Sequence, residues 1–541
     1  MRPPCGLRSS GKLPGGRPQF AAAIYAMKIL HITGNDLTLG EVRDVVYARR
    51  PVALAGPARS AVGRSRAAVD HILRENKLAY AITTGVGQLS DVRIAPEQNR
   101  QLQLNLLRSH ATGVGQSLSR EETRCMILLR ANSLARGYSG VRPILIDALC
   151  ELLNYQVHPI IPSQGSVGAS GDHAPLAHLA LVLIGEGEAV YPSPKKDDVL
   201  VSGSGADALR AAGLSALQLE AKEAISLING TQGMLAVGAL ALMSAEILAD
   251  SADVIAALSL DALRGTVLAF DDRIHQARPH PGQIRVAANL RGMLAGSQIR
   301  VSHADCGRVQ DAYSLRCIPQ VHGAVRDTLQ FCRNTFAIEM NSAVDNPLVF
   351  PAAQGEQCDV LSGGNFHGQP LAFALDYMAI ALTSLGGISE RRIERLVNPA
   401  LNEGLPPFLA SGAGLNSGFM MAQVTAASLV ADNRVLAHPA SVNSITTSGN
   451  KEDFVSMGMT SANKLKQVLI NTRMILAIEA LAAAQALDFL APLQTGARAR
   501  RAFAAIRKVS LKVTEDRVMA GDFEKSAALI ASGDLARLLA P

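Results

Sequence analysis

Beyond residue 206, apolar positions recur with the period of an α-helix over long stretches. Two runs follow this repeat most clearly, and their positions are Leu217, Ala221, Ala224, Ile225 and Ile228, then Leu465, Val468, Leu469, Thr472 and Leu476. Several such segments are apolar on most faces, which is typical of helices buried in a bundle or between subunits. The pattern predicts a long-helix bundle as the core, shared within an oligomer.

The N-terminal part shows shorter helices and many glycines. Residues 60–74 are amphipathic, with a basic side that we expect in solvent. Glycines between residues 85 and 171 indicate loops, which carry chemistry more often than helices do. A short β segment is expected from Asp345 to Phe350. The expected fold class is mainly α, with a loop-rich N-terminal region that carries the active site.

These patterns divide the chain into four expected parts. We expect a disordered extension at 1–27, a loop-rich catalytic region at 28–230, a central helical bundle at 231–495 and a charged helical part at 496–541. We expect no apolar run long and charge-free enough to span a bilayer, since even the stretch after Met474 is broken by Glu479. We therefore expect no membrane partner and a cytoplasmic protein.

Composition narrows the class of function. Among 541 residues, 48% are apolar and 18% charged, Trp is absent, and the formal net charge is only +6. Without a basic run interleaved with aromatics, nucleic-acid binding is not expected. Seven scattered cysteines suit free thiols in a reducing compartment. The spacings of His173 and His178, or of His303 with Cys306 and Cys317, match no standard metal site, so no metal is expected.

Residues 163–178 carry the motif with the most distinctive chemistry, SQGSVGASGDHAPLAH. If a bend brings the amide nitrogen of Gly171 against the carbonyl carbon of Ala169, cyclisation with loss of two waters gives a five-membered ring. Its exocyclic methylidene derives from Ser170. Glycine is needed at the attacking position because a Cβ would obstruct the approach. Taken alone, the segment is better explained as a helix-capping turn.

This segment resembles the methylidene-imidazolone signature of the histidine/phenylalanine/tyrosine ammonia-lyase family, and the resemblance runs from about Leu37 to Leu538. The other matching segments, in chain order, are YAITTGVG (80–87), RSHATG (108–113), LINGTQ (227–232), QDAYSLRC (310–317), GGNFHG (363–368) and NKEDFVSMG (450–458). The resemblance implies the ammonia-lyase/fumarase-like fold, a homotetramer whose active sites combine three subunits, and an autocatalytic methylidene-imidazolone with no diffusible cofactor.

The resemblance also assigns roles. Tyr80 would be the general base, with a tyrosine packed at a loop edge as the alternative. Arg316 would clamp the substrate carboxylate in a bidentate manner, unless it forms a structural salt bridge. The ring would act as an electrophile on the amine or on the aromatic ring of the substrate, a choice that stays open. The remaining implied site residues are Asn229, Gln310 and Tyr313, which would orient ring and substrate, and Phe366, which would shape the pocket.

Substrate choice depends on Ser109, His110 and Glu452. The Ser-His pair resembles histidine lyases more than the Phe-Leu or His-Leu pairs of many aromatic lyases, although some tyrosine-specific relatives share it. A carboxylate at Glu452 could hold an imidazole N–H, where phenyl-specific members tend to carry Gln. Histidine is the expected substrate. The alternatives are a tyrosine or phenylalanine lyase, an aminomutase, and a non-catalytic helical scaffold.

Five positions depart from the histidine-lyase pattern. They are Ala81 for Gly, Val86 for Phe, His173 for Leu, Ala312 for Pro and Lys451 for Gln. Val86 would enlarge the pocket. Lys451 places a cation beside Glu452 that could occupy its carboxylate, and this would compete with substrate binding.

Overall fold

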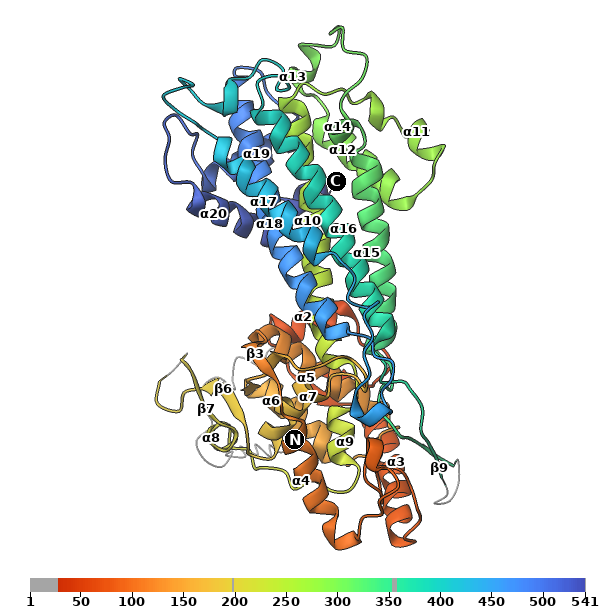
Figure 1. Ribbon diagram of the computed structural model, residues 1–541. Coiled ribbons are helices and arrows are strands. Elements are labelled where there is room, and N and C mark those ends of the chain that lie inside the picture. The colour runs from red at the N-terminus through yellow and green to blue at the C-terminus, as the bar shows by residue number, and fades with distance from the viewer. Residues whose placement is uncertain (1–27, 197–198, 353–357, 541) are drawn as a thin grey trace, which may run out of the picture.

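Four long helices form the centre of the molecule, α10 (Gln232–Ala262), α15 (Ile318–Met340), α16 (Gln369–Val397) and α18 (Gly458–Phe489), as Figure 1 shows. The computed structural model describes residues 28–196, 199–352 and 358–540, so the predicted disordered extension at 1–27 lies outside the described residues. The 31 residues of α10 span about 46 Å at 1.5 Å per residue. Leu258, Leu382 and Ile478 are fully buried between these helices. The predicted mainly α fold with a long-helix core is confirmed.

A charged pair lies inside this apolar bundle. The Arg392 guanidinium binds the Glu479 carboxylate through Nε–Oε1 (2.5 Å) and Nη2–Oε2 (2.9 Å), and neither side chain is exposed. The hydroxyls of Ser259 and Ser389 donate to the same carboxylate. A buried ion pair needs such extra hydrogen bonds to offset its desolvation. Glu479 therefore joins α18 to both α10 and α16.

Three helices meet the length and composition needed to cross a membrane. They are α10, α16 and α18, with mean hydropathy of 1.6, 1.6 and 1.4 over their most apolar windows. The expectation that no run is apolar enough is therefore wrong, because isolated charges such as Glu479 in α18 leave the mean hydropathy of these windows high. In the structure, 78%, 61% and 78% of these windows are buried inside the protein.

Shorter helices gather around the upper end of the bundle in Figure 1. These are α11 (Asp272–Gln276), α12 (Pro281–Leu294), α13 (Gln298–Val301), α14 (Tyr313–Arg316), α17 (Met420–Leu436), α19 (Ala497–Val509) and α20 (Ala520–Ala531). Short 3-10 turns accompany them at η3 (Leu268–Phe270), η4 (Pro407–Leu409) and η6 (Ala536–Leu539). Most of the described residues after Gly496 are helical, in α19, α20 and η6, with a non-helical link at 510–519.

The N-terminal residues form a head at the other end of the bundle (Figure 1). Its helices are α2 (Leu39–Val46), α3 (Gly56–Arg74), α4 (Asn99–His110), α5 (Arg120–Ala135), α6 (Pro143–Asn154), α7 (His173–Leu183), α8 (Gly205–Ala211) and α9 (Glu223–Ile228), with η1 (Gly87–Leu89) and η2 (Pro96–Gln98). A further 3-10 turn, η5 (Ser448–Asn450), lies against η1. The predicted amphipathic helix at 60–74 is confirmed within α3.

The strands are short and pair locally. Parallel β1 (Leu30–Ile32) and β2 (Val52–Leu54) form one pair, and β3 (Val114–Ser117) pairs antiparallel with β5 (Pro162–Gln164). The remaining strands are β4 (His158–Pro159), β6 (Glu188–Pro192) and β7 (Leu200–Ser204) in one sheet, and β8 (Leu348–Pro351) with β9 (Cys358–Leu361) in another. The short β signal at 345–350 thus corresponds to β8.

The helix expected from Leu217 is shorter than its apolar pattern suggests. It begins only at Glu223, because Lys222 has a left-handed backbone with φ +78°. Lys222 is fully buried, and its ammonium donates to Asp345 at 2.8 Å and to Ser226 at 2.9 Å. Burying this cation with its carboxylate fixes a turn where periodicity alone would continue a helix.

Candidate active site

The loop between β5 and α7 holds Ala169, Ser170 and Gly171 in a tight bend. Gly171 has φ +76°, and a Cβ placed on it would lie 2.1 Å from the carbonyl oxygen of Gly230. Gly168 is also left-handed, with φ +68°. The structure therefore requires glycine at the position whose nitrogen would attack in ring formation, for both conformational and steric reasons.

A second turn, at Asn229 and Gly230, braces this bend. Gly171 and Gly230 form a parallel bridge, and the amide of Asp172 donates to the Gly230 carbonyl at 2.7 Å. Behind the turn, the buried Arg130 donates through Nη1 to the Asn229 carbonyl and to the Gln232 amide oxygen, both at 2.8 Å. The side-chain oxygen of Asn229 is buried without a partner among the described residues. A buried, unsatisfied amide beside the bend fits a prosthetic ring formed there.

Asp172 fastens the bend to the start of α10. Its carboxylate accepts hydrogen bonds from the Met234 amide at 2.8 Å and from the Ser166 hydroxyl at 2.9 Å. Complete burial raises the pKa of Asp172 to about 6, although these hydrogen bonds oppose the shift.

Glu452 contacts the tripeptide directly. Its Oε1 accepts the Ser170 hydroxyl at 2.6 Å, and its Oε2 accepts the Thr447 and Ser448 hydroxyls at 2.8 and 2.7 Å. Burial raises the pKa of Glu452, but these three hydrogen bonds and His173 outweigh it and leave the pKa below its ordinary value. The neighbouring Lys451 makes no ion pair with Glu452 in the described part of the chain. The competition expected from Lys451 is therefore absent from this structure.

Two histidines lie beside this carboxylate. The His110 ring meets the His173 ring edge-on, with centroids 5.3 Å apart. His110 Nδ1 lies 2.8 Å from the Leu106 carbonyl, which only accepts, so this nitrogen carries the proton in the neutral ring and Nε2 is an acceptor. Burial lowers the pKa of His173 to about 4, so His173 is neutral near pH 7. The Ser109 hydroxyl stays at the end of α4, where it donates to Leu106.

Tyr80 lies in the loop before η1. The Gly87 amide donates to its phenolic oxygen at 3.1 Å. Ala81, which replaces a usual Gly, has φ +57° and is 4% exposed. Gln88 in η1 packs on Gly449 in η5, three residues before Glu452. The Tyr80 loop is thus held against the segment that carries Glu452.

The segment with Phe366 also reaches the tripeptide loop. The amide of Gly368 donates to the Gly168 carbonyl at 3.5 Å, and the Ser456 hydroxyl donates to the same carbonyl at 3.0 Å. Phe366 itself is partly buried. Segments at 165–172, 229–234, 366–368 and 452–458 therefore converge at the junction of head and bundle.

Three of the expected site residues lie far from Ser170 in this chain, namely Gln310, Tyr313 and Arg316. They precede α15, whose 23 residues extend for about 34 Å before Asn341 contacts Leu37 in the head. Figure 1 shows α14 at the end of the bundle opposite to α7. Tyr313 is 70% exposed, and the Arg316 guanidinium stacks on its ring at 4.6 Å. One subunit does not bring these three residues to Ser170.

Some residues of this site escaped sequence reasoning. They are Arg130, which contacts Asn229, and Thr447 and Ser448, which contact Glu452. In the sequence, only their proximity to the matched motifs could have indicated them. In the described residues no group of three or more His, Cys, Asp and Glu could hold a metal ion. The absence of a metal stays a prediction.

Comparison with known proteins agrees with this geometry. The family model described as aromatic amino acid lyase matches residues 37–508. A histidine ammonia-lyase of Koribacter versatilis is 66% identical over 518 residues, covering 94% of this chain and 99% of that protein.

Solved structures are similar over nearly the whole chain as well. The histidine ammonia-lyase of Trypanosoma cruzi has a TM-score of 0.86 at 40% identity, covering 95% of each chain. The tyrosine aminomutase of Streptomyces globisporus has a TM-score of 0.88 at 39% identity, covering 95% of this chain and 98% of that one. The chain belongs to the aromatic amino acid lyase family.

Proposed function

We propose that this protein eliminates ammonia from L-histidine to give trans-urocanate. The observation that carries the proposal is the ionised Glu452 carboxylate, bound to the Ser170 hydroxyl and close to His110 and His173. A phenyl ring offers no N–H to such a carboxylate, whereas an imidazole does. Relatives of up to 66% identity named histidine ammonia-lyase support the same substrate.

We infer that Ala169, Ser170 and Gly171 become a methylidene-imidazolone. Three observations support this inference: the left-handed backbone of Gly171, its parallel bridge with Gly230, and the unpartnered side-chain oxygen of Asn229. Once formed, the group supplies an electron-poor carbon that makes loss of the amine feasible. Ring formation removes the Ser170 hydroxyl as water, and this leaves Glu452 Oε1 free to accept another hydrogen bond.

The protein's own side chains then have separate tasks. Tyr80 takes the β-proton, and the Gly87 amide stabilises negative charge on its phenolic oxygen. The freed oxygen of Glu452 accepts an imidazole N–H, and Nε2 of His110 is a further acceptor. Arg316 binds the substrate carboxylate as a fork, with Gln310 and Tyr313 beside it. Asn229 orients the ring, and Phe366 closes the pocket.

These tasks need more than one subunit. Because α15 separates Arg316 from Ser170 by about 34 Å of helix, the carboxylate clamp must come from another copy of the chain. We infer a homotetramer, in which the Arg316 end of one copy lies at the Ser170 end of another.

Tyrosine aminomutase is the second candidate function. The Ser109-His110 pair and the likeness to the Streptomyces globisporus enzyme favour it. Purified protein should be incubated with histidine, tyrosine and phenylalanine, and the products identified. Urocanate formed from histidine, with no product from the other two amino acids, supports the proposal. A β-amino acid or coumarate formed from tyrosine would contradict it.

A further inference from the structure

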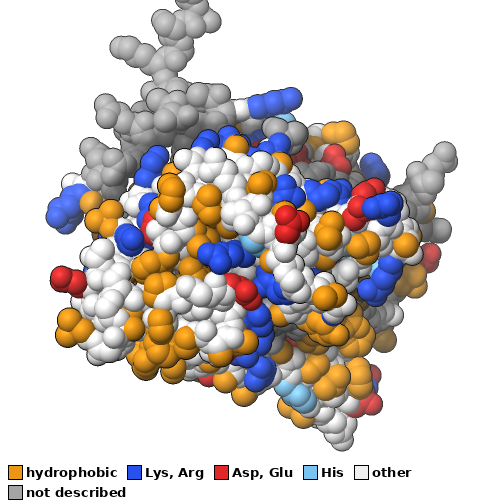
Figure 2. Space-filling model, turned by 90° about the horizontal axis from the view of Figure 1, so that it is seen from above, with side chains coloured by type: hydrophobic (Ala, Val, Ile, Leu, Met, Phe, Trp, Pro, Cys, Tyr) orange, Lys and Arg blue, Asp and Glu red, His pale blue; other side chains and the backbone are white. Residues whose placement is uncertain are grey.

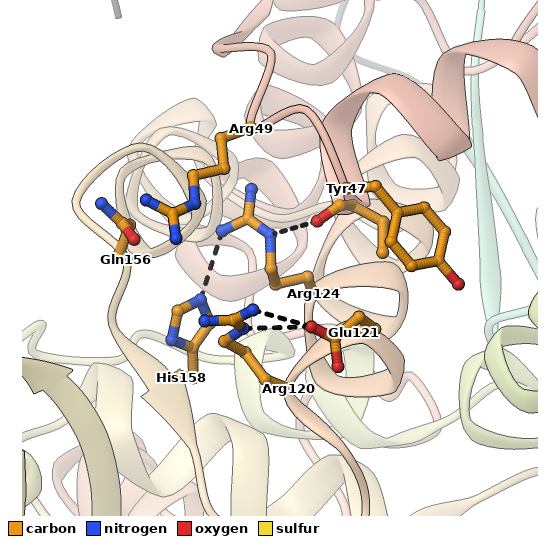
Figure 3. Close-up of a pocket in the computed structure, with 8 residues that line it drawn as sticks. Tyr47, Arg49, Arg120, Glu121, Arg124, Gln156 and His158 are labelled. Carbon is orange, nitrogen blue, oxygen red and sulfur yellow. Dashed lines mark hydrogen bonds and ion pairs between the residues drawn. The ribbon is translucent and has the colours of Figure 1, made fainter. Parts of the chain in front are cut away.

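A basic pocket lies in the head, away from the candidate active site. Its lining comes from the end of α2, the first turns of α5 and strand β4, as Figure 3 shows. The lining residues are Val46, Tyr47, Arg49, Arg120, Glu121, Arg124, Gln156 and His158. The cavity measures about 80 Å³, which is the room of two to three waters at about 30 Å³ each.

Arg124 forms the buried floor of this pocket. It is 2% exposed, and it donates to the carbonyls of Val45, Val46 and Leu153 at 2.7 to 3.2 Å. No carboxylate pairs with it in the described chain. Burial, followed by repulsion from Arg49 and Arg120, lowers the pKa of Arg124 to about 10. A buried guanidinium without a counter-ion is unfavourable, so this site lacks negative charge.

The two other arginines add to the imbalance. Among the described residues Arg120 binds Glu121 alone, its neighbour in sequence, at 2.9 Å. Arg49 makes no hydrogen bond or ion pair within residues 28–196, 199–352 and 358–540. Three guanidinium groups thus share one carboxylate. The N-terminus of α5 adds further positive potential at the same place.

His158 lines this pocket and carries one buried, unpartnered ring nitrogen. It is 2% exposed, and its Nε2 lies 3.2 Å from Nη1 of Arg124. Arginine only donates, so Nε2 must accept and the proton of the neutral ring is on Nδ1. Burial, with repulsion from the three arginines, lowers the pKa of His158 to about 3, which keeps the ring neutral. Nδ1–H is buried without a partner in the described structure.

The backbone around the pocket is also strained. Arg49 and Gln156 both adopt the left-handed conformation, with φ +58° and +57°. Such conformations in residues other than glycine concentrate at ligand-binding sites. The Gln156 side chain is mostly buried, yet its side-chain amide makes no hydrogen bond among the described residues.

We propose that this pocket binds a small tetrahedral oxyanion, with inorganic phosphate as the probe. The cavity volume suits one such ion, and the guanidinium groups of Arg49, Arg120 and Arg124 line it with a single carboxylate, Glu121, among them. Guanidinium groups match oxyanion geometry better than other cations do. Bound anion would stabilise the head, because any ligand specific to the native state raises its stability.

Calorimetric titration of the assembled full-length protein with phosphate tests this, against chloride at equal ionic strength. We expect saturable binding and a rise in the unfolding temperature that follows the same saturation curve. Arg49→Gln and Arg120→Gln should each raise the Kd for phosphate by about tenfold or more. Each substitution removes a hydrogen bond to a charged group. Sulfate should compete with phosphate.

Arg43→Gln is the matched control. Arg43 lies on α2, is exposed and in the described chain pairs with Asp44 alone, so its loss removes equal charge outside the pocket. Its Kd should stay within about twofold of the unmodified protein. Absence of saturable binding, or equal weakening in Arg43→Gln, would overturn the site. Acetate binding as tight as phosphate would overturn the proposed ligand class.

Discussion

At the scale of single residues, the hydroxyls of Ser170, Thr447 and Ser448 hold the Glu452 carboxylate before ring formation, and those of Thr447 and Ser448 still hold it afterwards. Glu452→Gln should lower kcat/KM for histidine by about 10- to 150-fold, since a hydrogen bond to a charged group contributes roughly 1.5 to 3 kcal/mol. Steady-state kinetics of urocanate formation measures this. Lys451→Gln is the control and should stay within about twofold, because Lys451 does not pair with the carboxylate. Equal losses in both variants would remove Glu452 from imidazole recognition.

The same carboxylate sets a stability dependence on pH. Its pKa is lower in the folded protein than the ordinary value of 4.5, so its stabilising contribution is present above pH 4.5. The contribution is lost as the pH falls through the lower folded value. Unfolding curves should therefore show that Glu452→Gln narrows the stability difference between pH 6 and pH 3. An unchanged difference would contradict the hydrogen bonds described.

Among the five positions that depart from the histidine-lyase pattern, His173 is the one whose effect on stability is easiest to predict. Its Nε2 is buried without a partner in the described chain, and leaving such a group unsatisfied costs about 1 to 3 kcal/mol. His173→Leu should therefore raise the unfolding temperature by a few degrees, as thermal denaturation would show. A lower unfolding temperature would mean that another subunit supplies a partner to this nitrogen.

At the scale of elements, the bend at Gly171 depends on the turn at Gly230. Gly171→Ala should block ring formation, because the added Cβ would meet the Gly230 carbonyl at 2.1 Å. Gly213→Ala is a matched control, since Gly213 has a similar φ of +71° with nothing within 4 Å of its Cβ. The mass of the peptide with Ser170 should stay unmodified in the first variant and be mature in the second. A mature ring in Gly171→Ala would refute the steric argument.

Periodicity predicted some elements better than others. It located α18 because Leu465, Val468 and Leu476 pack uniformly against apolar neighbours. It failed before Glu223, where the buried Lys222 binds Asp345 from a segment more than a hundred residues away. Such partners are invisible to local patterns. For the same reason the bracing of Asn229 by Arg130 could not be foreseen, although the motif around Asn229 could.

At the scale of the whole molecule, the proposed site residues lie at the two ends of a long bundle. The sequence resemblance implied sharing between subunits, but only the structure shows which residues are far apart. Co-expressed Ser170→Ala and Arg316→Ala subunits should regain activity in mixed assemblies, because some sites combine two intact contributions. Assays of each variant alone provide the baseline. Activity no higher than this baseline would place both residues in one subunit's site.

The most direct test of the account is the mass of the peptide containing Ala169, Ser170 and Gly171 in purified, histidine-deaminating protein. The account predicts a peptide lighter by two waters, with urocanate as the product. A full-mass tripeptide in protein that still releases ammonia from histidine would contradict it.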